Sequence, residues 1–90
     1  MEYRIFYVEN GGAQQSTQYY NVYHSSEALQ FLAHTFRRGH IDCQELKVLK
    51  IEEFDRFAGK WINRTDKAVE HAAVPELCSE GDEVWLRRES

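Results

Sequence analysis

The run of residues 2–9, EYRIFYVE, constrains the fold most, because it is rich in β-branched and aromatic residues throughout. Successive side chains of a strand point to opposite faces. One face of this strand carries Tyr3, Ile5 and Tyr7, and the other carries Arg4, Phe6 and Val8. The run therefore predicts a strand with apolar groups on both faces.

A second strand is predicted at residues 17–23, after a turn that contains Asn10, Gly11 and Gly12. These turn residues tolerate positive φ, which favours a β-hairpin. By the period of two, Tyr19 and Tyr23 share one face and Tyr20 takes the other. At least one tyrosine ring is therefore expected to point away from any helix that covers the sheet.

A helix is predicted over residues 26–38, where apolar side chains recur at steps of three and four. The stripe consists of Leu29, Leu32, Ala33 and Phe36. Ser25 and Ser26 can cap the helix, and Gly39 is placed to end it in the left-handed conformation.

The C-terminal half is less regular. Residues 45–52 and 83–88 have the β-branched and apolar content of strands. Helical spacing, which Gly59 interrupts, is followed by Phe54, Phe57, Ala58, Trp61 and Ile62. A short helix is therefore predicted over residues 52–59, with an irregular turn as the alternative. Another short helix is predicted from Thr65 or Asp66 through Ala73. Its inward side chains would be Ala68, Val69 and Ala72.

These elements predict a single α+β domain over residues 1–90, in the order ββαβ(α)(α)β. Consecutive strands tend to pair, which favours a three- or four-stranded, mostly antiparallel sheet with the helices on one face. Ninety residues fit one domain, and 42% hydrophobic residues can supply a core without supplying a membrane span.

The net charge of −4 is unevenly distributed. The stretch from Arg37 to Lys67 holds eight basic and six acidic residues, whereas most of the acidic excess follows it. Two cysteines are few for a small secreted domain, and the first residues lack the basic segment followed by an apolar run that is typical of a signal peptide. We therefore expect a cytoplasmic protein.

Four residues are of the types that zinc prefers as ligands, and they are therefore candidates for a metal site: His40, Cys43, His71 and Cys78. His40 and Cys43 have the short spacing of a metal-binding knuckle, but six residues separate His71 from Cys78. Buried structural cysteines explain this pattern more simply. We therefore predict no metal or cofactor, although the sequence leaves open whether the four residues converge.

No arrangement indicates catalysis. Cys43 lies close to Asp42 and His40 in the sequence, but the residues of a catalytic triad are brought together by the fold. The acidic pairs Glu52-Glu53 and Asp82-Glu83 could supply a general acid and base, but neighbouring charges of this kind are typical of a solvated face. Gly11 and Gly12 lack the rest of a phosphate-binding motif. The sequence therefore predicts a protein that is not an enzyme.

Tyrosine, tryptophan and arginine are enriched where proteins bind one another, and seven Tyr or Trp residues occur in this chain. We expect a small inhibitor, adaptor or regulator that binds a protein partner or itself. By size and charge it resembles the antagonists of host machinery that phages and mobile elements encode. The candidate contact residues are Tyr19, Tyr20, Tyr23, Arg37 and Arg38.

Binding of single-stranded RNA or DNA is the alternative function. The tyrosines of the sheet could stack on unpaired bases, and the basic region from Arg37 to Lys67 could contact phosphates. Six acidic residues interleave that region, and no known nucleic-acid-binding motif accompanies it.

Overall fold

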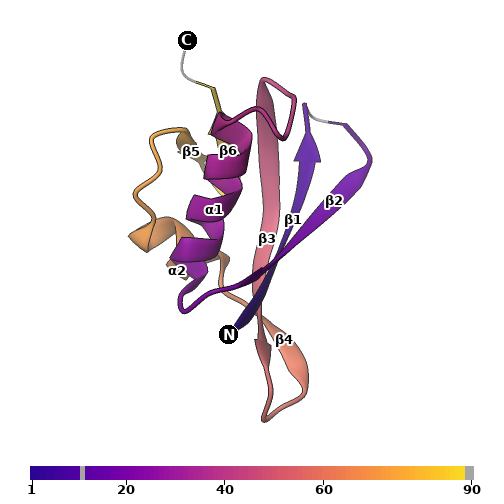
Figure 1. Cartoon of the computed structure of the whole chain (residues 1–90), viewed down its shortest axis with the longest axis vertical. Helices are drawn as coiled ribbons and strands as arrows, with labels where there is room; N and C mark the ends of the chain where they lie inside the picture. The colour runs from indigo at the N-terminus through magenta and orange to yellow at the C-terminus, as the bar shows by residue number, and fades with distance from the viewer. Residues whose placement is uncertain (11, 89–90) are drawn as a thin grey trace.

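The computed structural model describes residues 1–10 and 12–88, which form one antiparallel sheet and two helices (Figure 1). The elements follow in the order β1 (Glu2–Glu9), β2 (Gln15–Asn21), α1 (Ser25–Arg37), β3 (Glu45–Asp55), β4 (Lys60–Asn63), α2 (Thr65–His71), β5 (Leu77–Glu80) and β6 (Glu83–Arg87). The α+β class is confirmed. The prediction of three or four strands is wrong, because the sheet has six strands.

The strands lie in the order β2-β1-β3-β6-β5, and β4 pairs with β3 outside this path. The predicted hairpin of β1 and β2 is confirmed, with Tyr3 opposite Tyr20. Its turn includes Asn10, which has a φ of 50°, and Gly11, which lies outside the described residues. Because β3 also pairs with β1, the first strand is an interior strand of the sheet.

The core lies between the sheet and α1, which packs against β1, β2, β3 and α2. Leu29, Leu32 and Phe36 of α1 are fully buried, as the apolar stripe predicted. Burial of each such side chain contributes roughly 1.5–3 kcal/mol to folding. The helix predicted from the sequence starts one residue too late, and the predicted capping residues, Ser25 and Ser26, are wrong. His24 takes the N-cap position and Ser25 is buried inside the first turn.

The predicted helix over residues 52–59 is wrong. These residues continue β3 to Asp55 and then turn into β4, so that Phe54 lies opposite Trp61. The Asp55 carboxylate accepts hydrogen bonds from the backbone N–H groups of Phe57 and Ala58, at 2.9 and 3.1 Å. Gly59 has a φ of 66° and closes the turn by donating its N–H to the Asp55 carbonyl at 2.7 Å.

The helix predicted from Thr65 or Asp66 exists as α2, although it ends at His71 rather than Ala73. Thr65 does not cap it. Its hydroxyl instead accepts a hydrogen bond from the backbone N–H of Ile51 at 2.9 Å, which ties the helix to β3. Inside the helix, Ala68 faces the core as expected.

Strand β6 confirms the predicted C-terminal strand, while β5 was not predicted. It has only four residues and exists by pairing with β6, with Cys78 opposite Trp85. Among the described residues, neither helix has the length and apolar character needed to cross a membrane.

Candidate partner-binding surface

The two faces of the sheet differ in what covers them. Buried residues of α1, α2 and the strands form one core cluster, so both helices lie on the same face. Within the described residues, no helix lies on the other face, which we call the open face. The strand registers place these residues on it: Arg4, Phe6, Thr17, Tyr19, Glu45, Lys47, Lys50, Glu52, Phe54, Trp61, Trp85 and Arg87.

Arg4 organises one end of the open face. Its guanidinium carbon lies 4.0 Å from the ring centroid of Trp61 and 4.9 Å from that of Phe6. Arg4 Nε also donates a hydrogen bond to Glu52 Oε1 at 2.7 Å. Phe54 extends the group, since its ring centroid lies 5.2 Å from that of Trp61. Three strands therefore contribute to one aromatic cluster around a single cation, which we call the Arg4 cluster (Arg4, Phe6, Phe54, Trp61 and Glu52).

Trp85 occupies the other end of the open face. The Lys47 ammonium lies 5.9 Å from its ring centroid and the Arg87 guanidinium carbon lies 5.1 Å from it. The indole Nε1 of Trp85 is buried and has no hydrogen-bond partner among the described residues. This end thus repeats the combination of an aromatic ring with cations beside it.

The cations of the open face are paired with carboxylates. Arg87 Nε donates to Glu45 at 3.0 Å, and Lys47 forms an ion pair with Glu83. At the other end Lys50 Nζ lies 3.5 Å from Glu52, the carboxylate that also binds Arg4. These pairs balance the charge of the face, so its rings and paired charges form a surface of little net charge.

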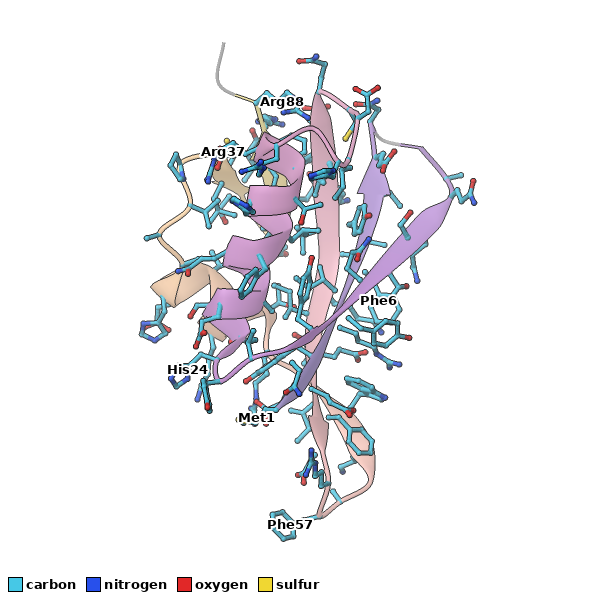
Figure 2. The ribbon with its side chains drawn as sticks, in the orientation of Figure 1. Met1, Phe6, His24, Arg37, Phe57 and Arg88 are labelled. Carbon is cyan, nitrogen blue, oxygen red and sulfur yellow. The ribbon has the colours of Figure 1, made fainter. Side chains whose placement is uncertain are left out.

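Phe57 stands at the tip of the β3–β4 hairpin, and its side chain is fully exposed. The hairpin extends past the helices at one end of the molecule, and Phe57 points outward from it (Figure 2). The turn bonds from Asp55 and the contact between Phe54 and Trp61 hold this tip in place. Arg56 directly precedes Phe57 in the chain and Lys60 begins β4 three residues after it, and both are exposed. A large apolar ring is therefore held in solvent by a well-braced turn.

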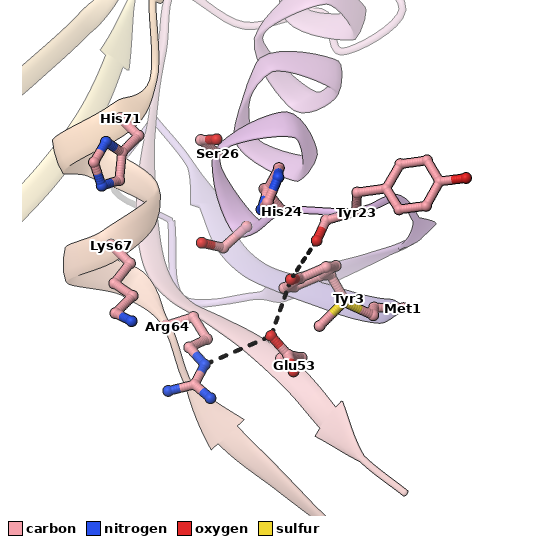
Figure 3. Close-up of a pocket in the computed structure, with 10 residues that line it drawn as sticks. Met1, Tyr3, Tyr23, His24, Ser26, Glu53, Arg64, Lys67 and His71 are labelled. Carbon is pink, nitrogen blue, oxygen red and sulfur yellow. Dashed lines mark hydrogen bonds and ion pairs between the residues drawn. The ribbon is translucent and has the colours of Figure 1, made fainter.

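A pocket of about 550 Å³ opens beside the first turn of α1 (Figure 3). The Tyr3 hydroxyl donates to Glu53 Oε1 at 2.9 Å, and Arg64 Nε lies 3.6 Å from the same oxygen. Burial, together with the Glu53 carboxylate, raises the pKa of Tyr3 to about 12. Lys67 and His71 line the pocket from α2. This bonded chain joins β1, β3 and the segment before α2.

The three predicted tyrosines lie in different surroundings. Tyr19 belongs to the open face and is 66% exposed, whereas Tyr20 faces the helices, where its ring stacks on Phe31 at 6.1 Å. Their predicted placement on opposite faces is confirmed. Tyr23 is 77% exposed but follows the end of β2, so the strand predicted over residues 17–23 is shifted by two residues from the observed Gln15–Asn21.

Arg37 and Arg38 lie at the opposite end of α1 from Tyr23. The helix has 13 residues, which separates its ends by about 20 Å. Figure 2 shows His24 and Arg37 at these two ends. Arg37 donates two hydrogen bonds to the buried Glu76, at 2.6 and 2.8 Å, and these bonds lower the pKa of Glu76. The five predicted contact residues therefore do not form one surface.

The four candidate zinc ligands, His40, Cys43, His71 and Cys78, do not converge on a metal site in the part of the chain that the structure describes. Among residues 1–10 and 12–88, no group of three or more histidine, cysteine or acidic side chains could hold a metal ion. Cys43 is buried, which raises its pKa, and Cys78 is partly buried; both are free thiols.

Sequence reasoning missed most of the open face. The alternation in residues 2–9 did place Arg4 and Phe6 together on one face, without indicating which face packs against the core. Trp61 was missed because the β3–β4 hairpin was predicted as a helix. The spacing of Asp55 and Gly59 around the turn was the signal that could have identified it. Comparison with protein-family models, curated proteins and solved structures finds no match for the chain.

Proposed function

We propose that this protein is a non-catalytic protein-binding domain, and that the open face together with Phe57 forms its contact surface. The observation that carries the proposal is the set of five aromatic rings on a sheet face that the described helices leave uncovered. The rings belong to Phe6, Tyr19, Phe54, Trp61 and Trp85. Aromatic residues and arginine dominate the binding energy of protein interfaces, which supports a protein as the partner.

The charges of the open face favour a protein over a nucleic acid. Binding to single-stranded nucleic acid relies on a positively charged groove and on ring faces that are free to stack on bases. Here Arg4 lies across the ring of Trp61, and its charge is paired with Glu52. Lys47 and Arg87 flank Trp85 and are likewise paired with carboxylates. Phosphates would have to displace these carboxylates, whereas a protein can cover the rings and leave the pairs intact.

Phe57 is the expected anchor of the contact. Moving a fully exposed phenylalanine into an apolar pocket of a partner contributes about 1.5–3 kcal/mol, which corresponds to roughly a tenfold to a hundredfold change in Kd. Arg56 and Lys60, exposed on the same hairpin, suit a partner pocket with acidic groups at its rim. By occupying such a pocket the domain would act as an inhibitor, adaptor or regulator.

Capture from an extract of the native host tests the proposal. The immobilised wild-type protein is compared with Phe57→Ser and with Phe31→Ser, a matched control in which a half-exposed phenylalanine of α1 on the helix side is replaced. We expect a stoichiometric protein partner that wild type and Phe31→Ser retain and that Phe57→Ser loses. Equal capture by all three proteins would refute the assignment of the surface. Retention on single-stranded RNA that falls steeply with salt would replace the protein partner by a nucleic acid.

A further inference from the structure

Strand β2 forms one free edge of the sheet, and it is unusual in carrying no charge. Its seven residues, QSTQYYN, contain no Asp, Glu, Lys or Arg and no proline. Strand β5 at the other edge has four residues, ends at Glu80 and follows Pro75 closely. Natural proteins protect edge strands by shortening them or by adding charges and proline. Strand β5 follows this pattern, and β2 does not.

The outward hydrogen-bonding groups of β2 follow from the ladder with β1. Val22 donates its N–H to the Met1 carbonyl at 3.0 Å, so Met1 and Val22 form a hydrogen-bonded pair. Such pairs alternate along an antiparallel ladder. The backbone groups of Ser16, Gln18 and Tyr20 therefore point toward β1. The backbone groups of Gln15, Thr17, Tyr19 and Asn21 therefore point outward from the free edge, in the plane of the sheet.

Exposed aromatic rings flank this edge on both faces of the sheet. Tyr19 lies on the open face and is 66% exposed. On the opposite face Phe31, which is 50% exposed, stacks on Tyr20. A strand added beside β2 would cover rings on both sides of the new backbone ladder. Main-chain bonds would then be combined with apolar burial, as in other cases of strand addition.

We propose that two copies of this chain pair through β2, antiparallel, about a two-fold axis at Gln18. A two-fold axis brings a strand opposite itself, so any charge on the strand would face a like charge nearby. The uncharged β2 meets this requirement, which applies to self-pairing and not to pairing with an unrelated strand. Thr17 of one copy then lies opposite Tyr19 of the other, and both have outward backbone groups. The two open faces join on the same side of one continuous sheet.

Sedimentation equilibrium of the purified protein from about 1 μM to 1 mM tests this pairing. We expect a concentration-dependent mass that approaches twice 10.6 kDa. Thr17→Lys/Tyr19→Lys places like charges in both facing pairs, so it should be monomeric throughout. Ser79→Lys adds a charge to the β5 edge instead and should dimerise like wild type. Circular dichroism verifies that each variant is folded.

A charge swap tests the register. Thr17→Lys/Tyr19→Glu places opposite charges in both facing pairs, so it should restore the dimer that the double lysine variant loses. A wild type that stays monomeric at 1 mM would overturn the proposal and leave the edge to a strand of another protein. A dimer that survives Thr17→Lys/Tyr19→Lys would also overturn it, because the copies would then meet elsewhere. Neither result bears on Phe57, so the proposed function is tested separately.

Discussion

Replacing Arg4 by methionine tests how much the contacts of this one cation on the open face contribute to folding stability. The change removes the 2.7 Å bond to Glu52 and the contacts over Trp61 and Phe6. A hydrogen bond to a charged group contributes about 1.5–3 kcal/mol and a cation–π contact about 0.5–1 kcal/mol at exposed sites. The Arg4 side chain is 24% exposed, and Glu52 keeps Lys50 at 3.5 Å as a weaker partner. We therefore expect a loss of about 2–3 kcal/mol of folding stability.

Urea unfolding monitored by tryptophan fluorescence measures this loss. Arg56→Met at the exposed hairpin tip is the matched control and should change the free energy of unfolding by less than about 0.5 kcal/mol. Arg4→Met/Glu52→Gln should cost less than Arg4→Met alone, because it leaves no carboxylate buried without its main partner. A loss below about 0.5 kcal/mol for Arg4→Met, or a double variant at least as unstable as the single one, would refute the reasoning.

Three further predictions concern single groups. The bonds from Arg37 lower the pKa of Glu76 in the folded protein, so their stabilisation is lost as the pH falls below about 4.5; Glu76→Gln should flatten the acid side of the stability curve in urea titrations. The pKa of Tyr3 is raised to about 12, so stability falls as the pH rises from 10 toward 12, and Tyr3→Phe should lose less over that interval. Phe57→Ser should leave the thermal midpoint within a few degrees of wild type, because the ring is fully exposed.

Local patterns identified the elements whose partners are close in the sequence. The hairpin of β1 and β2 and the helix α1 carry complete local signals, namely alternation, turn residues and an apolar stripe ended by Gly39. The left-handed φ of 80° at Gly39 confirms the predicted end of the helix. Such elements could be predicted because their stabilising contacts repeat at fixed short spacings.

The wrong predictions fall where distant residues decide the structure. Phe54 and Phe57 have helical spacing, yet residues 52–55 are strand because all four pair with β4, and the first two also pair with β1 on the other side. Strand β5 depends in the same way on β6. These long-range strand pairings override the local spacing of apolar residues. The local pattern of a single sequence does not indicate which distant strands will pair.

The candidate site was only partly predictable for the same reason. Alternation in β1 identified Arg4 and Phe6 as a second face, but Trp61 joins them through the hairpin that was missed. Arg37 and Tyr23 were grouped by residue type, although a helix length separates them. Composition therefore indicated a binding surface, and the topology determines which rings form it.

Site-specific photo-cross-linking tests the central claim most directly. A benzophenone amino acid replaces Phe57 in one protein and Phe31 in another, and each is irradiated in the native host extract. The two positions are exposed on different parts of the molecule, so only the side that meets the partner should react. We predict one discrete cross-link to a host protein from position 57 and none to a host protein from position 31, where a second copy of this chain is the only expected cross-linked product. A cross-link to a host protein from position 31 with none from position 57 would contradict the account.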